Sequence, residues 1–398
     1  DPHMAGYACW YNLQQLFTWV AKKGWTILLH TGVTNRCDLL KRFLQLSVNR
    51  FLPDITAGWH VVMHWSPQAS AETQEHAWQA QRATVGAYLP QAKFGVWHRF
   101  SPVGTELGDD ALFHSGILDQ ADFLACQADA NELLDLARLD PAHLSSAENY
   151  PVLKIRQILA ALRQRQRTLP VWLLSWNTLT GNTRATNGWF FRGALLMQNL
   201  LGLSEQVWLA GFWLNSGLQG EARTNNTLDT SSLALQYNHG LPRPIYWVLW
   251  LWQRLRGEVL VNDKSVLLLR HQGGYQLLLR NVVVFNPLLS SEEAFIQRFQ
   301  QQYHLQLQGM RGEWRIRRHL FDRHNGALYP LLEGVRSDSG PDEEMWRWIA
   351  HKARPTLSLR DERLNDGWQM TESLESNALV LYEFMPLNGR DEEDHSPR

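Results

Sequence analysis

Residues 59–67 read WHVVMHWSP, a short apolar run that ends in tryptophan, serine and proline. Runs that are apolar on both faces are typical of parallel strands buried on both sides. Similar runs recur along the first half of the chain, and most begin roughly 30–40 residues apart, which is the length of a βα unit. They are Thr26–Gly32 (TILLHTG), Lys93–Phe100 (KFGVWHRF), Ala121–Asp129 (ADFLACQAD), Pro170–Asn177 (PVWLLSWN) and Val207–Asn215 (VWLAGFWLN).

Amphipathic helices are expected between these strands, because apolar residues recur there at i, i+3, i+4 and i+7. The clearest sets are Leu13, Leu16, Phe17 and Val20, and then Ile155, Ile158, Leu159 and Leu162. Alternating strands and helices predict an α/β fold, either a doubly wound sheet or a barrel. A closed barrel needs eight strands, so either two units are absent from this chain or the sheet is open. No glycine-rich phosphate loop follows any strand, which disfavours a dinucleotide-binding fold.

The pattern changes near residue 257. SVLLLRHQGGYQLLLRN, residues 265–281, predicts two strands joined at Gly273-Gly274. Further alternating segments follow at residues 305–321 and 378–384. We therefore expect an α/β domain over 1–256, a small antiparallel all-β domain over 257–386, and a charged, disordered tail over 387–398.

The composition narrows the class of protein. A formal net charge of −1 argues against a dedicated nucleic-acid or membrane-surface protein. No uncharged apolar run is long enough for a transmembrane helix, and no signal peptide is recognisable. Cys9, Cys37 and Cys126 are widely spaced and odd in number, so we expect no disulfides and a cytoplasmic location. No metal or other cofactor is expected.

Several segments, taken in order, resemble glycoside hydrolase family 39, the β-xylosidase and α-L-iduronidase family. They are the opening DPHM, the stretch YNLQQLFTWVAKKGWTILLH at residues 11–30, LPRPIYWVLWLWQRLRGEVL at residues 241–260, and the hairpin around Gly273-Gly274. The resemblance implies a (β/α)₈ TIM barrel followed by a β-sandwich. It also implies that this chain starts at barrel strand three, with strands one and two missing from it.

The resemblance implies that both catalytic carboxylates are gone. A retaining glycosidase of this kind needs two carboxyl groups about 5–5.5 Å apart. Where the family has Trp-Asn-Glu-Pro, this chain has His64-Trp65-Ser66-Pro67, so Ser66 stands at the acid/base position. Where the family has Thr-Glu-Trp-Asn, it has Leu174-Ser175-Trp176-Asn177, so Ser175 stands at the nucleophile position. A serine hydroxyl holds its proton too tightly for general acid catalysis near neutral pH.

Two further family positions differ. The family's His-x-Tyr at the end of strand six corresponds to Gln127-Ala128-Asp129, and its aspartate after strand eight corresponds to Gly217. We therefore expect a non-catalytic site for a neutral sugar or oligosaccharide. Its expected residues are Trp65, Ser66, Gln127, Asp129, Ser175, Trp176, Asn177 and Trp213. The 19 tryptophans fit sugar platforms and core packing alike.

Alternatives stay open. Asp129 and Glu221 are a possible substitute carboxylate pair for an active glycosidase, against which stands the simpler interpretation of two solvated loop residues. His30, His64 and His98 end neighbouring strands and suit a metal, but hydrogen-bonded histidines on a rim are the favoured interpretation. A structural or interaction domain without a ligand is a third function. Relatives of this kind also occur as C-terminal domains of AraC-type bacterial transcription regulators, whose DNA-binding part would lie outside this segment. The oligomeric state is not predicted.

Overall fold

In the computed structural model the described residues are 7–33, 37–107, 110–129, 132, 149–177, 192–204, 206–207, 209–212, 235–237, 240–284, 293–333 and 342–387. The chain forms two compact units. The first unit comprises Asp1–Asp129, Pro151–Trp176 and Leu203–Phe212, and the second comprises Ala130–Tyr150, Asn177–Gly202 and Trp213–Arg398. The domain boundary expected near residue 257 stays a prediction.

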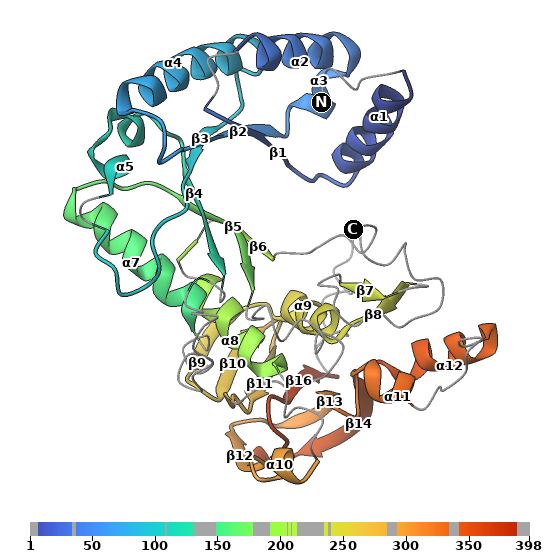
Figure 1. Cartoon of the computed structure of the whole chain (residues 1–398). Coiled ribbons are helices and arrows are strands. Elements are labelled where there is room, and N and C mark those ends of the chain that lie inside the picture. The colour runs from blue at the N-terminus through green and yellow to red at the C-terminus, as the bar shows by residue number, and fades with distance from the viewer. Residues whose placement is uncertain are drawn as a thin grey trace, which may run out of the picture. The chain divides into compact units, whose positions relative to one another are not determined.

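The first unit is built on a six-stranded sheet whose strands follow one another in sequence order. They are β1 (Ile27–Thr31), β2 (Trp59–His64), β3 (Phe94–Trp97), β4 (Leu124–Asp129), β5 (Val171–Asn177) and β6 (Leu209–Phe212). The neighbours β1–β2, β2–β3, β3–β4 and β5–β6 pair in parallel. The sheet curves as a half-barrel (Figure 1), which confirms the expected α/β class.

Helices cover one face of this sheet, which we call the outer face (Figure 1). They are α1 (Tyr7–Lys22), α2 (Cys37–Arg50), α3 (Pro53–Thr56), α4 (Ala71–Tyr88), α5 (Ala111–His114), the 3₁₀ turn η1 (Gly116–Asp119) and α7 (Tyr150–Gln164). Aromatic packing joins the layers: the ring of Trp59 lies 4.8 Å from that of Phe17, and Trp78 lies 4.5 Å from Phe94. Ser70 precedes helix α4 as its N-cap, and its hydroxyl accepts a hydrogen bond from the backbone N–H of Thr73.

The opposite, inner face carries its own apolar cluster. Val62, Phe123, Ala125 and Trp172 are buried there, with Leu28, Trp97 and Leu174 packed against them. The rings of Phe123 and Trp172 stack 3.8 Å apart. Phe123 lies over Gly95, where a Cβ atom would meet the ring at 2.4 Å. A glycine in β3 is therefore what admits this aromatic layer.

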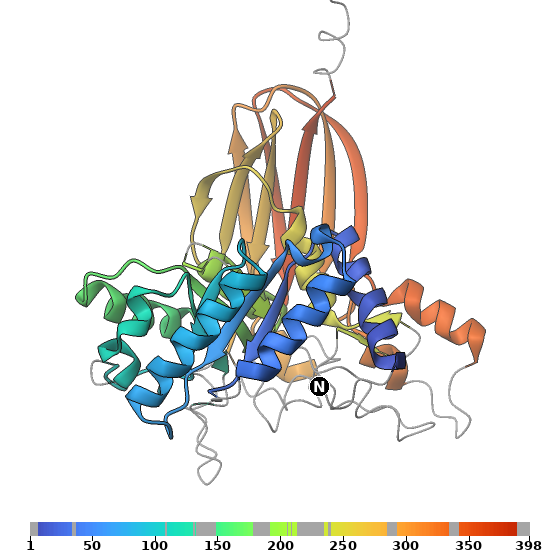
Figure 2. The same ribbon diagram turned by 90° about the horizontal axis from the view of Figure 1, so that it is seen from above.

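The second unit contains separate antiparallel sheets. The largest has the order β14-β13-β16-β11-β10-β9, and smaller sheets pair β12 with β15 and β7 with β8. The long strands of the largest sheet stand side by side in Figure 2. The strands are β7 (Gln236–Tyr237), β8 (Leu241–Pro242), β9 (Glu258–Asn262), β10 (Val266–His271), β11 (Gly274–Arg280), β12 (Gln301–Gln308), β13 (Gly312–Phe321), β14 (Thr356–Leu364), β15 (Gly367–Leu374) and β16 (Leu379–Pro386).

The hairpin predicted near Gly273-Gly274 is confirmed, one residue earlier than the sequence pattern indicated. Strands β10 and β11 pair antiparallel from Val266↔Leu279 to His271↔Gly274. The two-residue turn is Gln272-Gly273, with φ of 49° and 75°. Both residues occupy the left-handed region that a type I′ turn requires.

The helices of the second unit are α8 (Gly193–Ser204, largely in this unit), α9 (Pro244–Arg254), α10 (Glu293–Gln297), α11 (Tyr329–Glu333) and α12 (Glu343–Lys352). A small core of Leu241, Leu328, Leu332, Ile349 and Ala353 lies beneath α12. Between sheets, the ring of Trp368 on β15 lies 5.2 Å from Tyr382 on β16. None of the described helices of either unit is long and apolar enough to cross a membrane.

Candidate functional site

The candidate site lies in the first unit, where β1 to β5 reach their carboxyl ends. Parallel strands bring these ends to one edge of a sheet, which is where barrel enzymes build their sites. Ser66 follows β2, Gln127 lies in β4 and Ser175 lies in β5, and all three side chains are half-buried. Gln127 shares the inner face with Ala125, two residues earlier in the strand.

The backbone of Ser66 is held by a buried glutamine of α4. Its N–H donates to the Gln74 Oε1 atom at 2.9 Å, and Gln74 Nε2 donates to the carbonyl of Ala69 at 3.2 Å. One residue earlier, the N–H of Trp65 donates to the carbonyl of Trp97 at 2.8 Å. The loop after β2 is thereby fixed to helix α4 and to strand β3.

A second buried glutamine fixes the end of β1. The hydroxyl of Thr31 donates to Gln81 Oε1 at 2.6 Å, and Gln81 Nε2 donates to the carbonyl of Gly32 at 2.9 Å. Gln74 and Gln81 are 1% and 2% exposed and lie seven residues apart on α4. Seven residues are two helical turns, so both side chains leave the same face of the helix.

Sequence reasoning missed these two glutamines, although a signal was present. Gln74 and Gln81 stand on the stripe that also carries Ala77, Trp78 and Val85, which are buried against the sheet. A polar residue on the apolar stripe of a helix is a candidate for a buried hydrogen-bonding role.

Two of the three strand-end histidines contact each other directly. The Nδ1 atom of His30 on β1 lies 2.7 Å from the Nε2 atom of His64 on β2. The ring of His64 stacks on Trp97 of β3, with centroids 4.4 Å apart and planes at 27°. His30 is exposed, whereas His64 and Trp97 are half-buried, so the three strands present one continuous row of rings.

Both histidines of this pair favour the neutral state. Burial lowers the pKa of His30 below its ordinary value. Burial and then the neighbouring charge of His30 lower the pKa of His64. A hydrogen bond between two imidazole nitrogens needs a protonated nitrogen as donor and an unprotonated nitrogen as acceptor. Protonation of the acceptor nitrogen therefore breaks the bond. The site end of the sheet is therefore uncharged at this pair near neutral pH.

The third histidine has a different partner. His98 Nε2 lies 2.7 Å from Asp110 Oδ2, and the histidine side chain is 5% exposed. Burial acts to raise the pKa of Asp110, but the hydrogen bond and the charge of His98 outweigh it and leave that pKa lowered. The three histidines do not converge on one point here, and the described part of the chain holds no group of three or more histidine, cysteine or acidic residues arranged for a metal ion.

The structure places the expected tryptophans as follows. Trp65 is 4% exposed and Trp176 is 1% exposed, so each ring is enclosed by protein. Trp97, which was not singled out from the sequence, is the half-buried ring beside the site. A β-bulge between Leu173 and Trp176 shifts the strand register next to Ser175, so strand alternation does not fix the direction of the serine side chain.

The remaining expected site residues cannot be located in the same way. The backbones of Asp129 and Asn177 lie in β4 and β5, but their side chains are outside the described residues, as are Trp213, Gly217 and Glu221. The proposed Asp129–Glu221 pair therefore stays a prediction.

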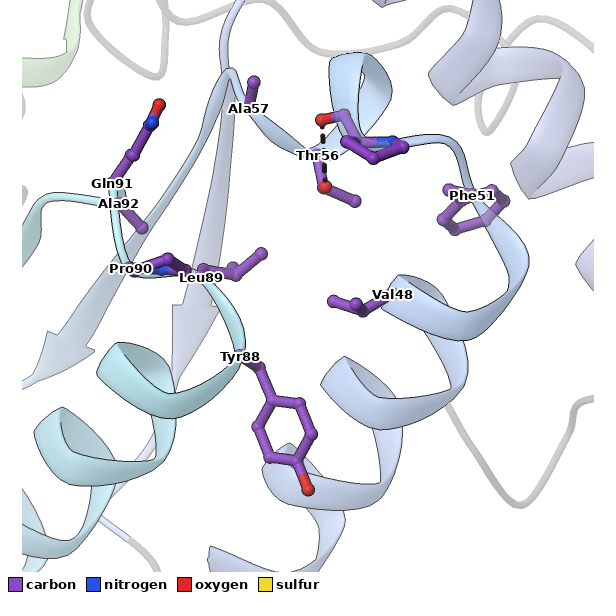
Figure 3. A pocket seen from close by; sticks show the side chains of 10 residues that line it. Val48, Phe51, Thr56, Ala57, Tyr88, Leu89, Pro90, Gln91 and Ala92 are labelled. Atoms are coloured by element: carbon purple, nitrogen blue, oxygen red, sulfur yellow. Dashed lines mark hydrogen bonds between the residues drawn. The ribbon is translucent and has the colours of Figure 1, made fainter.

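An apolar pocket of about 270 Å³ lies at the other end of the strands (Figure 3). It is lined by the ends of α2 and α4, including Val48 and Tyr88, and by residues that precede β2 and β3, including Ala57 and Ala92. Barrel proteins use this end for stability rather than for chemistry. It brings together none of the expected site residues.

The site end of the sheet thus offers several hydrogen-bonding groups that carry no charge, while the side chain of Asp129 at the end of β4 lies outside the described residues. Ser66, Gln127, Ser175, His30 and His64 are its accessible or half-buried polar residues on β1, β2, β4 and β5. None of them is a carboxylate. Hydroxyl, amide and neutral imidazole groups donate and accept hydrogen bonds to neutral ligands, and Trp97 adds an aromatic surface.

No protein-family model matches the chain. Among curated proteins it is 26% identical over 263 residues to uncharacterized HTH-type transcriptional regulators of Staphylococcus aureus strains COL and MSSA476. These matches cover 66% of this chain and 35% of each regulator, so the chain spans about a third of the length of its curated relatives.

Solved structures of glycosidases share the fold at low sequence identity. A monomeric β-xylosidase from Caulobacter crescentus CB15 superposes with a TM-score of 0.72 at 14% identity, covering 95% of this chain and 85% of that one. A GH39 enzyme from Xanthomonas axonopodis pv. citri gives 0.64 at 12% identity, covering 88% and 72%. A glucosidase from Croceicoccus marinus gives 0.62 at 13% identity, covering 97% and 83%. The chain thus has a fold like that of family 39 glycoside hydrolases and is a distant homologue, over part of its length, of HTH-type transcriptional regulators.

Proposed function

We propose that this chain binds a neutral sugar or short oligosaccharide at the carboxyl ends of its parallel strands and does not cleave it. The observation that carries the proposal is the pair Ser66 and Ser175, which stand where the resemblance to family 39 expects the acid/base and the nucleophile. Glycoside hydrolysis by this route needs two carboxyl groups. Two hydroxyls retain hydrogen bonding to sugar hydroxyls but supply neither function.

The uncharged side chains among the described site residues support a neutral ligand. His30 and His64 hold each other in a hydrogen bond that requires at least one neutral ring. Gln127 lies on the inner face, and no arginine stands among the expected site residues to pair with an anionic sugar. Weak binding, in the micromolar to millimolar range, corresponds to ~4–8 kcal/mol of binding free energy.

The resemblance to family 39 also leads to a proposal about the fold. We propose that β1 to β6 are strands three to eight of a family 39 barrel and that the antiparallel sheets form its β-sandwich. In the observed sheet, β1 and β6 are the two edge strands. Exposed parallel edges favour association with other chains, so supplying two more strands should reduce aggregation.

The regulator homologues suggest the biological setting. We propose that the domain serves as the cytoplasmic sensor of a bacterial DNA-binding regulator of the AraC type and that DNA is not bound through this segment, whose formal net charge is −1. The gene context tests this point. A helix-turn-helix encoded in the same reading frame supports it, and a free-standing reading frame without one contradicts it.

The binding experiment compares variants at the two ends of the parallel sheet for their effect on sugar binding. The full chain is screened by thermal shift and calorimetry against D-xylose, L-arabinose, D-glucose and xylobiose. Gln127→Ala should abolish the shift, because it removes an amide from the inner face. Gln91→Ala, at the opposite strand end and exposed, is the matched control and should retain it.

The alternatives give different results. Hydrolysis of an aryl β-xyloside that is lost on Asp129→Asn or Glu221→Gln would establish a substitute catalytic pair and overturn the non-catalytic proposal. A melting temperature unchanged by every sugar at millimolar concentration would leave a structural or interaction role as the better account.

A further inference from the structure

A second cavity, in the second unit, has a chemistry unlike that of the sugar site. It has a volume of about 700 Å³ and lies between α9 and strands β13 and β14. Its lining combines the rings of Tyr246 and Trp250 with the guanidinium groups of Arg254, Arg317 and Arg354. This volume is within the range of small-molecule sites, and none of the described residues that line the cavity is acidic.

The aromatic residues of α9 that line the cavity are held in place by their neighbours. Trp247 Nε1 donates to the carbonyl of Ala353 at 2.8 Å, which ties α9 to the segment after α12. The ring of Trp250 lies 5.2 Å from that of His319, and the Arg254 guanidinium lies 4.7 Å from the Trp250 centroid. A ring fixed on both sides loses little side-chain entropy when a ligand packs against it.

One of the three arginines is already neutralised. Arg254 forms a 2.6 Å ion pair with Glu383, which also lies 3.3 Å from His319. Burial acts to raise the pKa of Glu383, but the hydrogen bonds from His319 and Arg254 and their charges lower it to about 2. Glu383 is therefore ionised throughout the ordinary pH range, and its charge offsets that of Arg254.

The other two arginines form no ion pair with the described residues. Arg354 Nε donates to the carbonyl of Ala350 at 2.8 Å, which anchors it without neutralising it. Arg317 makes no hydrogen bond or ion pair with any part of the chain that the structure describes. Cation-rich sites of this kind attract carboxylates and phosphates, which guanidinium groups bind with paired hydrogen bonds.

Arg317 and its neighbour Arg315 differ in whether the carboxylate opposite them is free to pair. Arg315, two residues earlier on the same face of β13, pairs across the strands with Asp361 and forms two hydrogen bonds to it at 2.9 Å. Arg317 pairs with Leu359 on β14, which is 54% exposed, and with Glu383 on β16, whose carboxylate is already bound by Arg254. Arg315 thus forms an ion pair across the sheet, whereas Arg317 forms none with the described residues, and the Glu383 carboxylate opposite it is bound by Arg254 and His319.

We propose that this groove is a second ligand site, for a small anionic sugar that carries one carboxylate or phosphate. The anion is bound by Arg317 and Arg354, and the sugar ring packs between the aromatic residues of α9 and the exposed leucines of β14. The two anion types share this chemistry, and separate probes distinguish them. The proposal is independent of the neutral-sugar site, because every residue it uses belongs to the second unit.

Calorimetry of the full chain tests the proposal with four probes. D-glucuronate supplies a carboxylate on a ring and glucose 6-phosphate a phosphate on a ring, while D-glucose lacks the charge and inorganic phosphate lacks the ring. We expect one of the two charged sugars to bind at least about tenfold more tightly than D-glucose and inorganic phosphate. The binding should weaken as sodium chloride rises, because salt screens exposed charges.

Two matched variants locate the site. Arg317→Gln should weaken binding of the charged sugar about tenfold or more, whereas Arg315→Gln, on the same strand and face, should leave it unchanged. Unchanged melting temperatures would show that both variants fold. The proposal is overturned if neither charged sugar binds at millimolar concentration, if D-glucose or inorganic phosphate binds equally well, or if Arg315→Gln weakens binding as much as Arg317→Gln.

Discussion

His30 and His64 stand on adjacent parallel strands with their ring nitrogens 2.7 Å apart, at the edge of the sheet where a ligand is expected. Neither residue is near the other in sequence, since 34 positions separate them. The parallel pairing of β1 with β2 sets His30 opposite Val62, and His64, two residues beyond Val62 on the same face, comes within reach of the His30 ring.

The His30–His64 pair should make stability depend on pH. Both pKa values are lowered from 6.5 in the folded chain, by burial and, for His64, also by the charge of His30. Below pH 6.5 the unfolded chain therefore binds protons that the folded chain resists. The stabilisation is complete above pH 6.5 and is lost as the pH falls from there through the lower folded values. Urea unfolding between pH 7.5 and 5 measures this decline.

The variant His64→Gln should flatten that decline relative to the parent chain, because it removes one titrating group and leaves His30 without a histidine neighbour. His76→Gln is the control, since His76 is exposed on α4 and outside the pair. Equal pH dependence in the parent and in His64→Gln would contradict the interpretation.

Much of the fold was predictable because it rests on local patterns. Apolar runs such as residues 59–64 and 171–176 became β2 and β5, since a strand buried on both faces needs a continuous apolar sequence. The hairpin before β11 was predictable from its glycines, although the left-handed turn residue beside Gly273 is Gln272. That shift of one residue depends on pairing with the rest of the sheet, which local sequence does not encode.

The site was predictable only in outline. The roles expected of Ser66 and Ser175 followed from a family resemblance. The structure confirms only that Ser66 follows β2 and that Ser175 lies in β5. The contact of His64 with His30 and Trp97 depends on the register of three strands. Such register is fixed by packing over the whole sheet, so spacing along the chain gave only three separate histidines.

Helix α4 should fix the end of β1 through Gln81. Gln81→Leu removes the acceptor of the Thr31 hydroxyl and the donor to the carbonyl of Gly32. The Thr31 hydroxyl keeps the carbonyl of Val62 as an acceptor and Gly32 is exposed, so the variant should lose about 0.5–1.5 kcal/mol of unfolding free energy, the net contribution of such hydrogen bonds. Gln79→Leu, at an exposed position of the same helix, should change it by less than about 0.5 kcal/mol. Chemical denaturation of both variants measures the difference, and equal losses would contradict the assignment.

Replacing a glycine by alanine should lower the stability of the chain at one position, on a strand, and raise it at another, on a helix. At Gly95 the added Cβ would lie 2.4 Å from the Phe123 ring, which is stacked on Trp172, so Gly95→Ala should cost about 1–3 kcal/mol through overpacking. At Gly86 on α4 nothing lies within 4 Å of the added atom. Gly86→Ala should therefore stabilise the chain by about 0.5–1 kcal/mol. Melting temperatures of both variants measure the two signs.

In the second unit, Arg318 and Glu372 should tie β13 to the smaller sheet. Arg318 donates two hydrogen bonds to Glu372, at 2.8 Å and 2.6 Å, and the hydroxyl of Tyr382 also donates to it. The carboxylate raises the pKa of Arg318. Arg318→Ala leaves the carboxylate of Glu372, whose side chain is 6% exposed, without its counter-charge. We expect a loss of about 3 kcal/mol or more in unfolding free energy.

A double variant separates the cost of burying an unpaired charge from the net contribution of the ion pair to stability. Replacing Arg318 and Glu372 together by methionine removes both charges and keeps apolar volume, so it should recover most of that loss, because the desolvation of a buried pair offsets its attraction.

Arg315→Ala breaks a pair of the same chemistry on the same strand, but Arg315 and Asp361 are 40% and 49% exposed, and water replaces the lost contact. Its unfolding midpoint should stay close to that of the parent. A loss for Arg315→Ala as large as for Arg318→Ala would show that burial does not distinguish the two pairs.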